Sequence, residues 1–283
     1  MFSHLIGPVD PWSEATRHIG IAADLAAAVD GTVEVVTVVD RIDDLAPASV
    51  VLQRVVDELG PLAVEPTTAV VAGDSVAAAL AARLDARPGS MIIMGSHGRG
   101  RSAAVLGSTT DAILRDTFGP TIVVGPGVKQ TKGEAGGTYV VPLDGSERAD
   151  GVLSIVGAWS IEFGGTPWLV EVLDADVPVG DVAETAFVAR RAHTVSDTIG
   201  RSVEFEALRG SPPGRAIVDF ATSQDASLIF MATHGRTGLA RLRAGSVAAD
   251  VVRHAPCPVV LFRPPDLAVP SDGGDLAAAG APT

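Results

Sequence analysis

The chain has 283 residues, of which 47% are hydrophobic, and this is enough for two cores of ordinary size. Its formal charge is −13, from 21 basic and 34 acidic residues. The acidic balance argues against nucleic-acid or anionic-membrane binding, because both need a basic surface. The single cysteine, Cys257, excludes an intrachain disulfide and a multi-cysteine metal site, and we expect it to be buried.

The strands and helices that we predict alternate along the chain and fall into two similar series. The first series comprises strand 5–9, helix 13–29, strand 33–39, helix 49–59, strand 67–71, helix 75–86, strand 90–94, helix 108–117 and strand 120–124. The second comprises strand 139–143, helix 146–163, strand 168–173, helix 182–199, strand 203–208, helix 214–223, strand 227–231, helix 246–254 and strand 258–262.

The two series are copies of one unit, because identical or similar residues recur in the same order. The offset between matched residues rises slowly from 134 to 138, as small loop insertions would produce. The matched residues are Pro8/Pro142, Asp10/Asp144, Val38/Val172, Met94/Met231, Gly98/Gly235, Gly107/Gly245 and Ser108/Ser246. Alternating strands and helices of this length favour two tandem Rossmann-like α/β domains, each a five-stranded parallel sheet flanked by helices.

The segment between the copies, residues 125–137, is rich in glycine and polar residues and holds both lysines of the chain, Lys129 and Lys132. We place domain 1 at 1–126 (copy 1), a linker at 127–137 and domain 2 at 138–264 (copy 2). We expect the tail, 265–283, to be disordered. The amino-terminal residues show no signal peptide, and no apolar stretch reaches the roughly 18 residues of a membrane span. We therefore expect a cytoplasmic protein.

The repeated residues converge on one edge of each predicted sheet. Asp10 and Asp144 follow the first strand, Val38 and Val172 lie near the end of the second, and a glycine loop follows the fourth. The carboxyl ends of parallel strands share an edge, and ligands bind there where the strand order reverses. We therefore expect one binding site in each copy.

The glycine loop has the chemistry of an anion site. It reads Gly95-x2-Gly98-x8-Gly107-Ser108 in copy 1 and Ala232-x2-Gly235-x9-Gly245-Ser246 in copy 2. Glycine permits a positive φ and a close approach to a ligand, and the helix start offers free N–H groups and a positive dipole end. Phosphate fits such a site. A Walker A sequence and a dinucleotide fingerprint after the first strand are both absent, which excludes a P-loop NTPase and disfavours a dehydrogenase.

Together these features resemble the universal stress protein family in a tandem form, over residues 3–126 and 138–264. The residues that carry the resemblance are the motif G-x2-G-x9-G-[S/T], the aspartate after strand one, the strand-two valine and the proline before strand five. The resemblance implies an adenine nucleotide alpha hydrolase-like fold that binds ATP, with or without Mg²⁺. It also implies that the two copies pack through their fifth strands, as an intramolecular pseudo-dimer; a further homodimer is the alternative assembly.

The resemblance also assigns nucleotide-binding positions. In copy 1 these are Pro8, Asp10, Val38, Met94, Gly95, Gly98, Gly107, Ser108 and Thr109. In copy 2 they are Pro142, Asp144, Val172, Met231, Ala232, Gly235, Gly245, Ser246 and Val247. Both copies depart from the motif, because copy 1 has eight residues where the motif has nine and copy 2 replaces the first glycine with Ala232. We expect copy 2 to be the better triphosphate site.

Other interpretations of these residues stay open. Asp10 and Asp144 are also suited to helix capping or turn formation, and the glycine loops to a tight connection. The loop arginines either hold phosphate or form a solvated rim; they are Arg99, Arg101, Arg236, Arg241 and Arg243. His97 and His234 have no accompanying nucleophile and carboxylate, so a loop-bracing role is favoured over catalysis.

The function that these residues favour is ATP binding by a regulator of stress response or dormancy, with slow or no hydrolysis. The alternatives are a weak ATPase, a binder of cyclic nucleotides, and an interaction module that holds no nucleotide.

Overall fold

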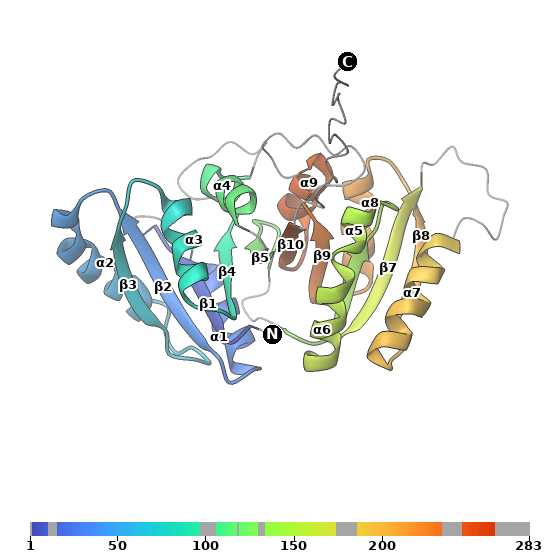
Figure 1. Cartoon of the computed structure of the whole chain (residues 1–283), viewed down its shortest axis with the longest axis horizontal. Helices are drawn as coiled ribbons and strands as arrows, with labels where there is room; N and C mark the ends of the chain where they lie inside the picture. The colour runs from blue at the N-terminus through green and yellow to red at the C-terminus, as the bar shows by residue number, and fades with distance from the viewer. Residues whose placement is uncertain are drawn as a thin grey trace, which may run out of the picture.

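The computed structural model describes residues 2–10, 16–96, 106–117, 119–129, 134–173, 186–233 and 245–263. These residues form one ten-stranded sheet with helices packed on it (Figure 1). The elements of copy 1 are β1 (His4–Pro8), α1 (Arg17–Ala27), β2 (Thr32–Val39), the 3-10 turn η1 (Ile42–Asp44), α2 (Leu45–Asp57), β3 (Thr67–Ala72), α3 (Val76–Ala86), β4 (Ser90–Gly95), α4 (Ser108–Asp116) and β5 (Gly119–Val124).

Copy 2 repeats this order. Its elements are β6 (Thr138–Pro142), α5 (Glu147–Asp150), α6 (Leu153–Phe163), β7 (Thr166–Leu173), α7 (Ala186–Ile199), β8 (Glu204–Arg209), α8 (Pro213–Ser223), β9 (Leu228–Ala232), α9 (Ser246–His254) and β10 (Val259–Arg263). The predicted elements are therefore present, with ends that differ by a few residues.

The strand order is β3-β2-β1-β4-β5-β10-β9-β6-β7-β8. Strands within each copy pair in parallel, and the order reverses between β1 and β4 and between β6 and β9. The two copies join through β5 and β10, which pair antiparallel. This confirms the predicted fold class and the predicted packing of the copies through their fifth strands.

One predicted helix is wrong in detail, because residues 146–163 form two helices rather than one. The short α5 is capped by Ser146, whose hydroxyl accepts a hydrogen bond from the N–H of Ala149 at 3.2 Å. Gly151 follows it, and glycine is a poor helix former. The chain resumes as α6 at Leu153.

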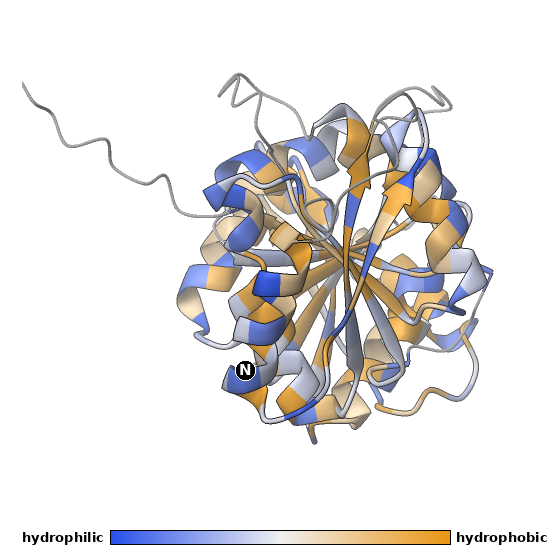
Figure 2. Cartoon of the chain, turned by 90° about the vertical axis from the view of Figure 1, so that its right-hand side faces the viewer, coloured by the Kyte–Doolittle hydropathy of each residue, from blue (hydrophilic) through white to orange (hydrophobic). Residues whose placement is uncertain are grey.

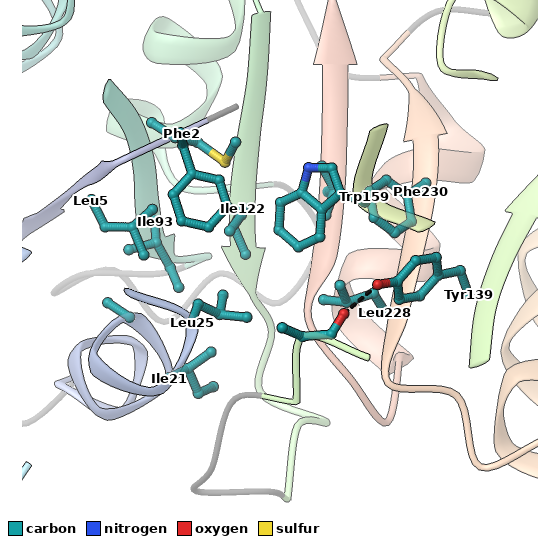
Figure 3. Close-up of a cluster of buried hydrophobic side chains, with 14 of the residues drawn as sticks. Phe2, Leu5, Ile21, Leu25, Ile93, Ile122, Tyr139, Trp159, Leu228 and Phe230 are labelled. Atoms are coloured by element: carbon teal, nitrogen blue, oxygen red, sulfur yellow. Dashed lines mark hydrogen bonds between the residues drawn. The ribbon is translucent and has the colours of Figure 1, made fainter. Parts of the chain in front are cut away.

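The core runs across the boundary between the copies. Apolar residues concentrate on the strands and on the inner helix faces, and polar residues lie outward (Figure 2). Figure 3 shows buried side chains of both copies in one cluster. In this cluster the ring centroid of Phe2 in copy 1 lies 5.4 Å from that of Trp159 in copy 2. The ring centroids of Trp159 and Phe230 are 5.3 Å apart. The two copies therefore share hydrophobic burial as well as strand pairing.

The described parts of the segment between the copies, residues 125–137, are packed. Gly125 and Gly127 lie against the backbone at the end of α9, where a β-carbon on Gly125 would come within 1.8 Å of the Val252 carbonyl oxygen. Val128 is fully buried, and Arg17 donates a hydrogen bond to its carbonyl. Residues 130–133 and the predicted tail lie outside the described residues.

Over the ranges that the structure describes, the helices are all too short or too polar to cross a membrane.

Candidate functional site

The first strand of each copy ends in the same way. The N–H of Val9 donates to the carbonyl of Val36 at 2.8 Å, and the N–H of Leu143 donates to the carbonyl of Val170 at 2.8 Å. Each bond extends the pairing of the first two strands by one residue. Asp10 and Asp144 follow directly, half-buried, at the carboxyl edge where the strand order reverses.

The glycine loop of each copy is closed at its base by matching backbone hydrogen bonds. In copy 1 the N–H of Ser96 donates to Val124 (3.0 Å), and the N–H of Gly107 donates back to Ser96 (2.9 Å). In copy 2, Thr233 donates to the carbonyl of Phe262 at 2.9 Å, and Gly245 donates to that of Thr233 at 2.8 Å. The loop between these bonds has ten residues in copy 1 (97–106) and eleven in copy 2 (234–244). The two copies therefore differ by one residue inside the loop, while the base of the loop is closed in the same way in both.

Helices α4 and α9 begin where these loops close. Gly107 and Gly245 occupy the N-cap positions with φ of −55° and −54°, so the expected positive φ is wrong for these two glycines. The restriction at Gly245 is steric, because a β-carbon at this position would lie 3.3 Å from the Thr233 carbonyl oxygen. Ser108 and Ser246, the first helical residues, are exposed, and their N–H groups belong to the unpaired first turn.

Asp144 takes part in a turn. Its Oδ1 accepts hydrogen bonds from the backbone N–H of Ser146 at 3.0 Å and from the Ser146 hydroxyl at 2.6 Å. The turn role that the sequence left open is therefore present in copy 2, and it fixes the orientation of this carboxylate. In copy 1 the position matching Ser146 is Trp12, which has no hydroxyl group and lies outside the described residues.

The apolar residues assigned to the base pocket lie in one cluster in each copy. Val38 packs against the cluster that contains buried Met94. Val172 packs in the same manner against the cluster that contains buried Met231. In both copies the second-strand valine and the fourth-strand methionine therefore belong to one apolar cluster, although the first strand lies between their strands.

The remaining predicted residues fall into two groups. Pro8, Pro142, Gly95, Ala232, Thr109 and Val247 are half-buried at strand ends or in the first turn of α4 and α9. The residues outside the described ranges are Gly98, Gly235, His97, His234 and the loop arginines Arg99, Arg101, Arg236, Arg241 and Arg243.

Two buried polar residues at the carboxyl edge of the copy 1 strands were not predicted from the sequence. His18 on α1 hydrogen-bonds the carbonyl oxygen of Pro8 at 3.0 Å, and Thr37 on β2 donates to that of Val9 at 2.8 Å. Burial lowers the pKa of His18 to about 4, so its ring is neutral at physiological pH. The available signals were a histidine on an apolar helix face and a threonine inside a valine-rich strand.

Cys257 has the buried position that we expected. Burial raises the pKa of its thiol to about 12, so the thiolate needed for reaction is not populated near neutral pH.

Doubly wound parallel units, duplicated in one chain and each carrying a glycine loop closed at its base at the strand ends, define a tandem α/β protein of the doubly wound class. The profile of the universal stress protein family matches the sequence twice, at residues 1–125 and 138–263. The chain belongs to the universal stress protein family.

Several proteins similar to this chain are universal stress proteins. A universal stress protein from Methanocaldococcus jannaschii is 32% identical over 143 residues, which cover 44% of this chain and 81% of that protein. Another from Mycobacterium tuberculosis, strain H37Rv, is 28% identical over 203 residues, covering 64% of this chain and 62% of its own length. The solved structure of a universal stress protein from Archaeoglobus fulgidus matches with a TM-score of 0.65 at 21% identity, over 93% of this chain and 97% of that one, and shows the shared fold.

Proposed function

We propose that the protein binds ATP at the carboxyl edge of one or both copies and acts as a nucleotide-dependent regulator rather than an efficient catalyst. The observation that carries the proposal is the closure of both loops onto a helix start, through Gly107 and Ser96 in copy 1 and Gly245 and Thr233 in copy 2. An identical closure in two diverged copies is expected of a site that both copies inherited.

The phosphate end of the proposed site consists of backbone groups. The first N–H groups of α4 and α9 have no partner within the helix, and the helix dipole favours an anion there. Ser108 and Ser246 add an exposed hydroxyl at the same point. Neither copy contains a lysine outside the linker, so the triphosphate would rely on these groups and on the loop arginines.

The base end of the proposed site lies at the neighbouring strands. The carboxylates of Asp10 and Asp144 are acceptors suited to the adenine amino group, and Val38 and Val172 offer an apolar contact for the ring. The turn at Asp144 orients its carboxylate in advance, because Ser146 already donates two hydrogen bonds to Oδ1. This observation and the full-length phosphate span favour copy 2 as the tighter site.

A regulatory role follows from the lack of catalytic chemistry in the sequence beside the loops. His97 and His234 are not accompanied by a nucleophile and carboxylate pair, so we expect hydrolysis to be slow or absent. The cytoplasmic location, a further homodimer and the domain limits at 126, 137 and 264 stay predictions.

Calorimetry with ATP, with and without Mg²⁺, tests the proposal on the full chain. Gly107→Asp and Gly245→Asp each place a carboxylate in one anion site, and Gly107→Ala and Gly245→Ala are controls that add the β-carbon alone. We expect each aspartate variant to remove one component of binding and the alanine variants to keep most of it. ATP binding that no aspartate variant alters would place the nucleotide elsewhere, and no binding by the wild type would refute the proposal.

The same titration separates the alternatives. If cyclic AMP binds more tightly than ATP, the ligand of the site would be a cyclic nucleotide. Steady phosphate release that the aspartate variants abolish would make the protein an ATPase. No heat from any adenine nucleotide would favour an interaction module without a ligand.

A further inference from the structure

The end of β1 in copy 1 is held by two buried side chains from different elements. The ring Nε2 of His18 on α1 lies 3.0 Å from the Pro8 carbonyl oxygen, and the hydroxyl of Thr37 on β2 lies 2.8 Å from the Val9 carbonyl oxygen. A carbonyl oxygen only accepts, so Nε2 carries the proton and donates. His18 is 2% exposed and Thr37 is 1% exposed, so water does not compete for these bonds.

These two bonds act on consecutive peptide groups. The carbonyl of Pro8 is bonded from the helix layer and that of Val9 from the neighbouring strand, while the N–H of Val9 is bonded to Val36. Fixing both peptide planes sets the direction in which the chain leaves the sheet. The next residue is Asp10, which we assign to the base end of the proposed nucleotide site.

Neither side chain at the matching positions of copy 2 can donate an equivalent bond. At the matching positions, 134 residues on, stand Val152, which has no side-chain donor, and Glu171, whose ionised carboxylate only accepts. Copy 2 keeps the shared backbone bond from Leu143 to Val170. It then orders the following residues through the turn between Asp144 and Ser146.

We propose that His18 and Thr37 are positioning residues for the nucleotide site of copy 1, where they fix Asp10 through the carbonyls of Pro8 and Val9. In copy 2 the turn between Asp144 and Ser146 orders the equivalent position. This inference deepens the proposed function and depends on it for the ligand, but the anchoring of β1 is testable without any ligand.

Two pairs of variants separate the hydrogen bonds from packing. Thr37→Val keeps the shape of the side chain and removes the donor, whereas Thr37→Ser keeps the hydroxyl. His18→Leu removes the ring donor, whereas His18→Gln retains a side-chain N–H of similar reach. Val152→Ala is the matched control in copy 2, because it loses buried packing at the equivalent position without touching either anchor.

Hydrogen exchange on the nucleotide-free full chain tests the anchoring itself. Loss of a donor to a buried carbonyl should speed exchange of the segment 4–10 by about tenfold in Thr37→Val and His18→Leu. Thr37→Ser and His18→Gln should restore most of the protection, and the segment 138–144 should stay unchanged in these four variants. Exchange in 4–10 that matches the wild type in both donor-free variants would overturn the proposal.

ATP titration in a Gly245→Asp background, which leaves copy 1 as the ATP site, tests the consequence for binding. We expect Thr37→Val and His18→Leu to weaken ATP binding by about tenfold, and Thr37→Ser, His18→Gln and Val152→Ala to stay near the parent. Faster exchange with unchanged ATP affinity would overturn the positioning role. If the Gly245→Asp parent binds no ATP, nucleotide binding by copy 1 is refuted. The hydrogen-exchange result would then test only whether His18 and Thr37 anchor the end of β1.

Discussion

Ile122 and Val260 face each other across the antiparallel pair of β5 and β10, and they occupy the same position in the two copies, 138 residues apart. Thr121 pairs with Leu261, and Val123 pairs with Val259. The same offset of 138 residues relates one of these pairs to the other, because Thr121 matches Val259 and Val123 matches Leu261. The seam is therefore self-complementary, as in a twofold dimer, although both halves belong to one chain. Both Ile122 and Val260 are buried, so the seam is part of the core.

The first prediction concerns this seam. Ile122→Ala should destabilise the whole chain by about 2–5 kcal/mol, because the cavity opens in a core that both copies share. In a Trp12→Phe background two tryptophans of copy 2 remain: Trp159, which packs against Phe2 of copy 1, and Trp168, which packs against Phe220 inside copy 2. We expect their fluorescence transition in urea to shift together with the loss of circular dichroism.

The control for this seam experiment is Val50→Ala on α2, where the side chain is 66% exposed. Its free energy of unfolding should change by less than about 0.5 kcal/mol. A tryptophan transition that does not move in Ile122→Ala would show that the copies unfold independently.

The second prediction concerns pH. The pKa of His18 is lowered to about 4 in the folded chain, against 6.5 for the unfolded side chain. Between these values the unfolded chain binds the proton and the folded chain does not, so stability falls as the pH falls through this window. The loss should reach about 3 kcal/mol near pH 4.

Urea unfolding at pH 7.5 and pH 4.5 measures this effect in wild type and in His18→Gln. The variant should lose less stability on acidification, because it has no ring to protonate. Equal losses in the two proteins would contradict a neutral buried His18.

The third prediction concerns a difference between the copies at the opposite edge of the sheet. In copy 1 Arg83 Nη1 donates to Glu34 at 3.1 Å, and His4 lies 3.7 Å from the same carboxylate. The matching residues in copy 2, Trp168 and Phe220, form an edge-on aromatic contact at 5.5 Å. One position pair therefore uses an ion pair in one copy and apolar packing in the other.

Because breaking a half-buried pair leaves a charge without its partner, Glu34→Leu alone should cost about 2 kcal/mol. The double variant Glu34→Leu/Arg83→Leu should cost less than the sum of its single variants. Urea unfolding of the four proteins measures the coupling, and simple additivity would argue against an energetic link between Glu34 and Arg83.

The fourth prediction concerns Leu106, the residue before Gly107 at the end of the copy 1 loop. Its buried side chain packs in a cluster formed mainly by copy 2, including Ile217 and Val252. Leu106→Ala should therefore lower the free energy of unfolding by about 2–4 kcal/mol. It should also raise hydrogen exchange in α9, and an unchanged rate there would show that the loop of copy 1 is not coupled to copy 2.

Much of the fold is predictable because its signals are local. Short apolar runs are marked by glycine or proline, as in 90–94, which lies between two glycines, and in 258–262, which starts with a proline. The near-constant offset fixes the order of the elements in both copies. The helix starts at Ser108 and Ser246 also follow from local sequence, since glycine precedes each of them.

The missed features depend on partners far apart in the sequence. His18 and Thr37 donate to carbonyls on another segment, and Leu106 packs in a cluster that belongs mainly to the other copy. The break before Leu153 is different, because it follows a local signal, Gly151 at the end of α5. None of these partners appears in hydrophobic periodicity, which reports burial but not hydrogen-bond geometry.

The most direct test of nucleotide binding at the two loop edges is native mass spectrometry of the full chain with ATP. The wild type should gain the mass of one or two ATP molecules, and the double variant Gly107→Asp/Gly245→Asp should gain none. A wild type that gains no nucleotide at millimolar ATP, or a double variant that gains as much as the wild type, would contradict this account.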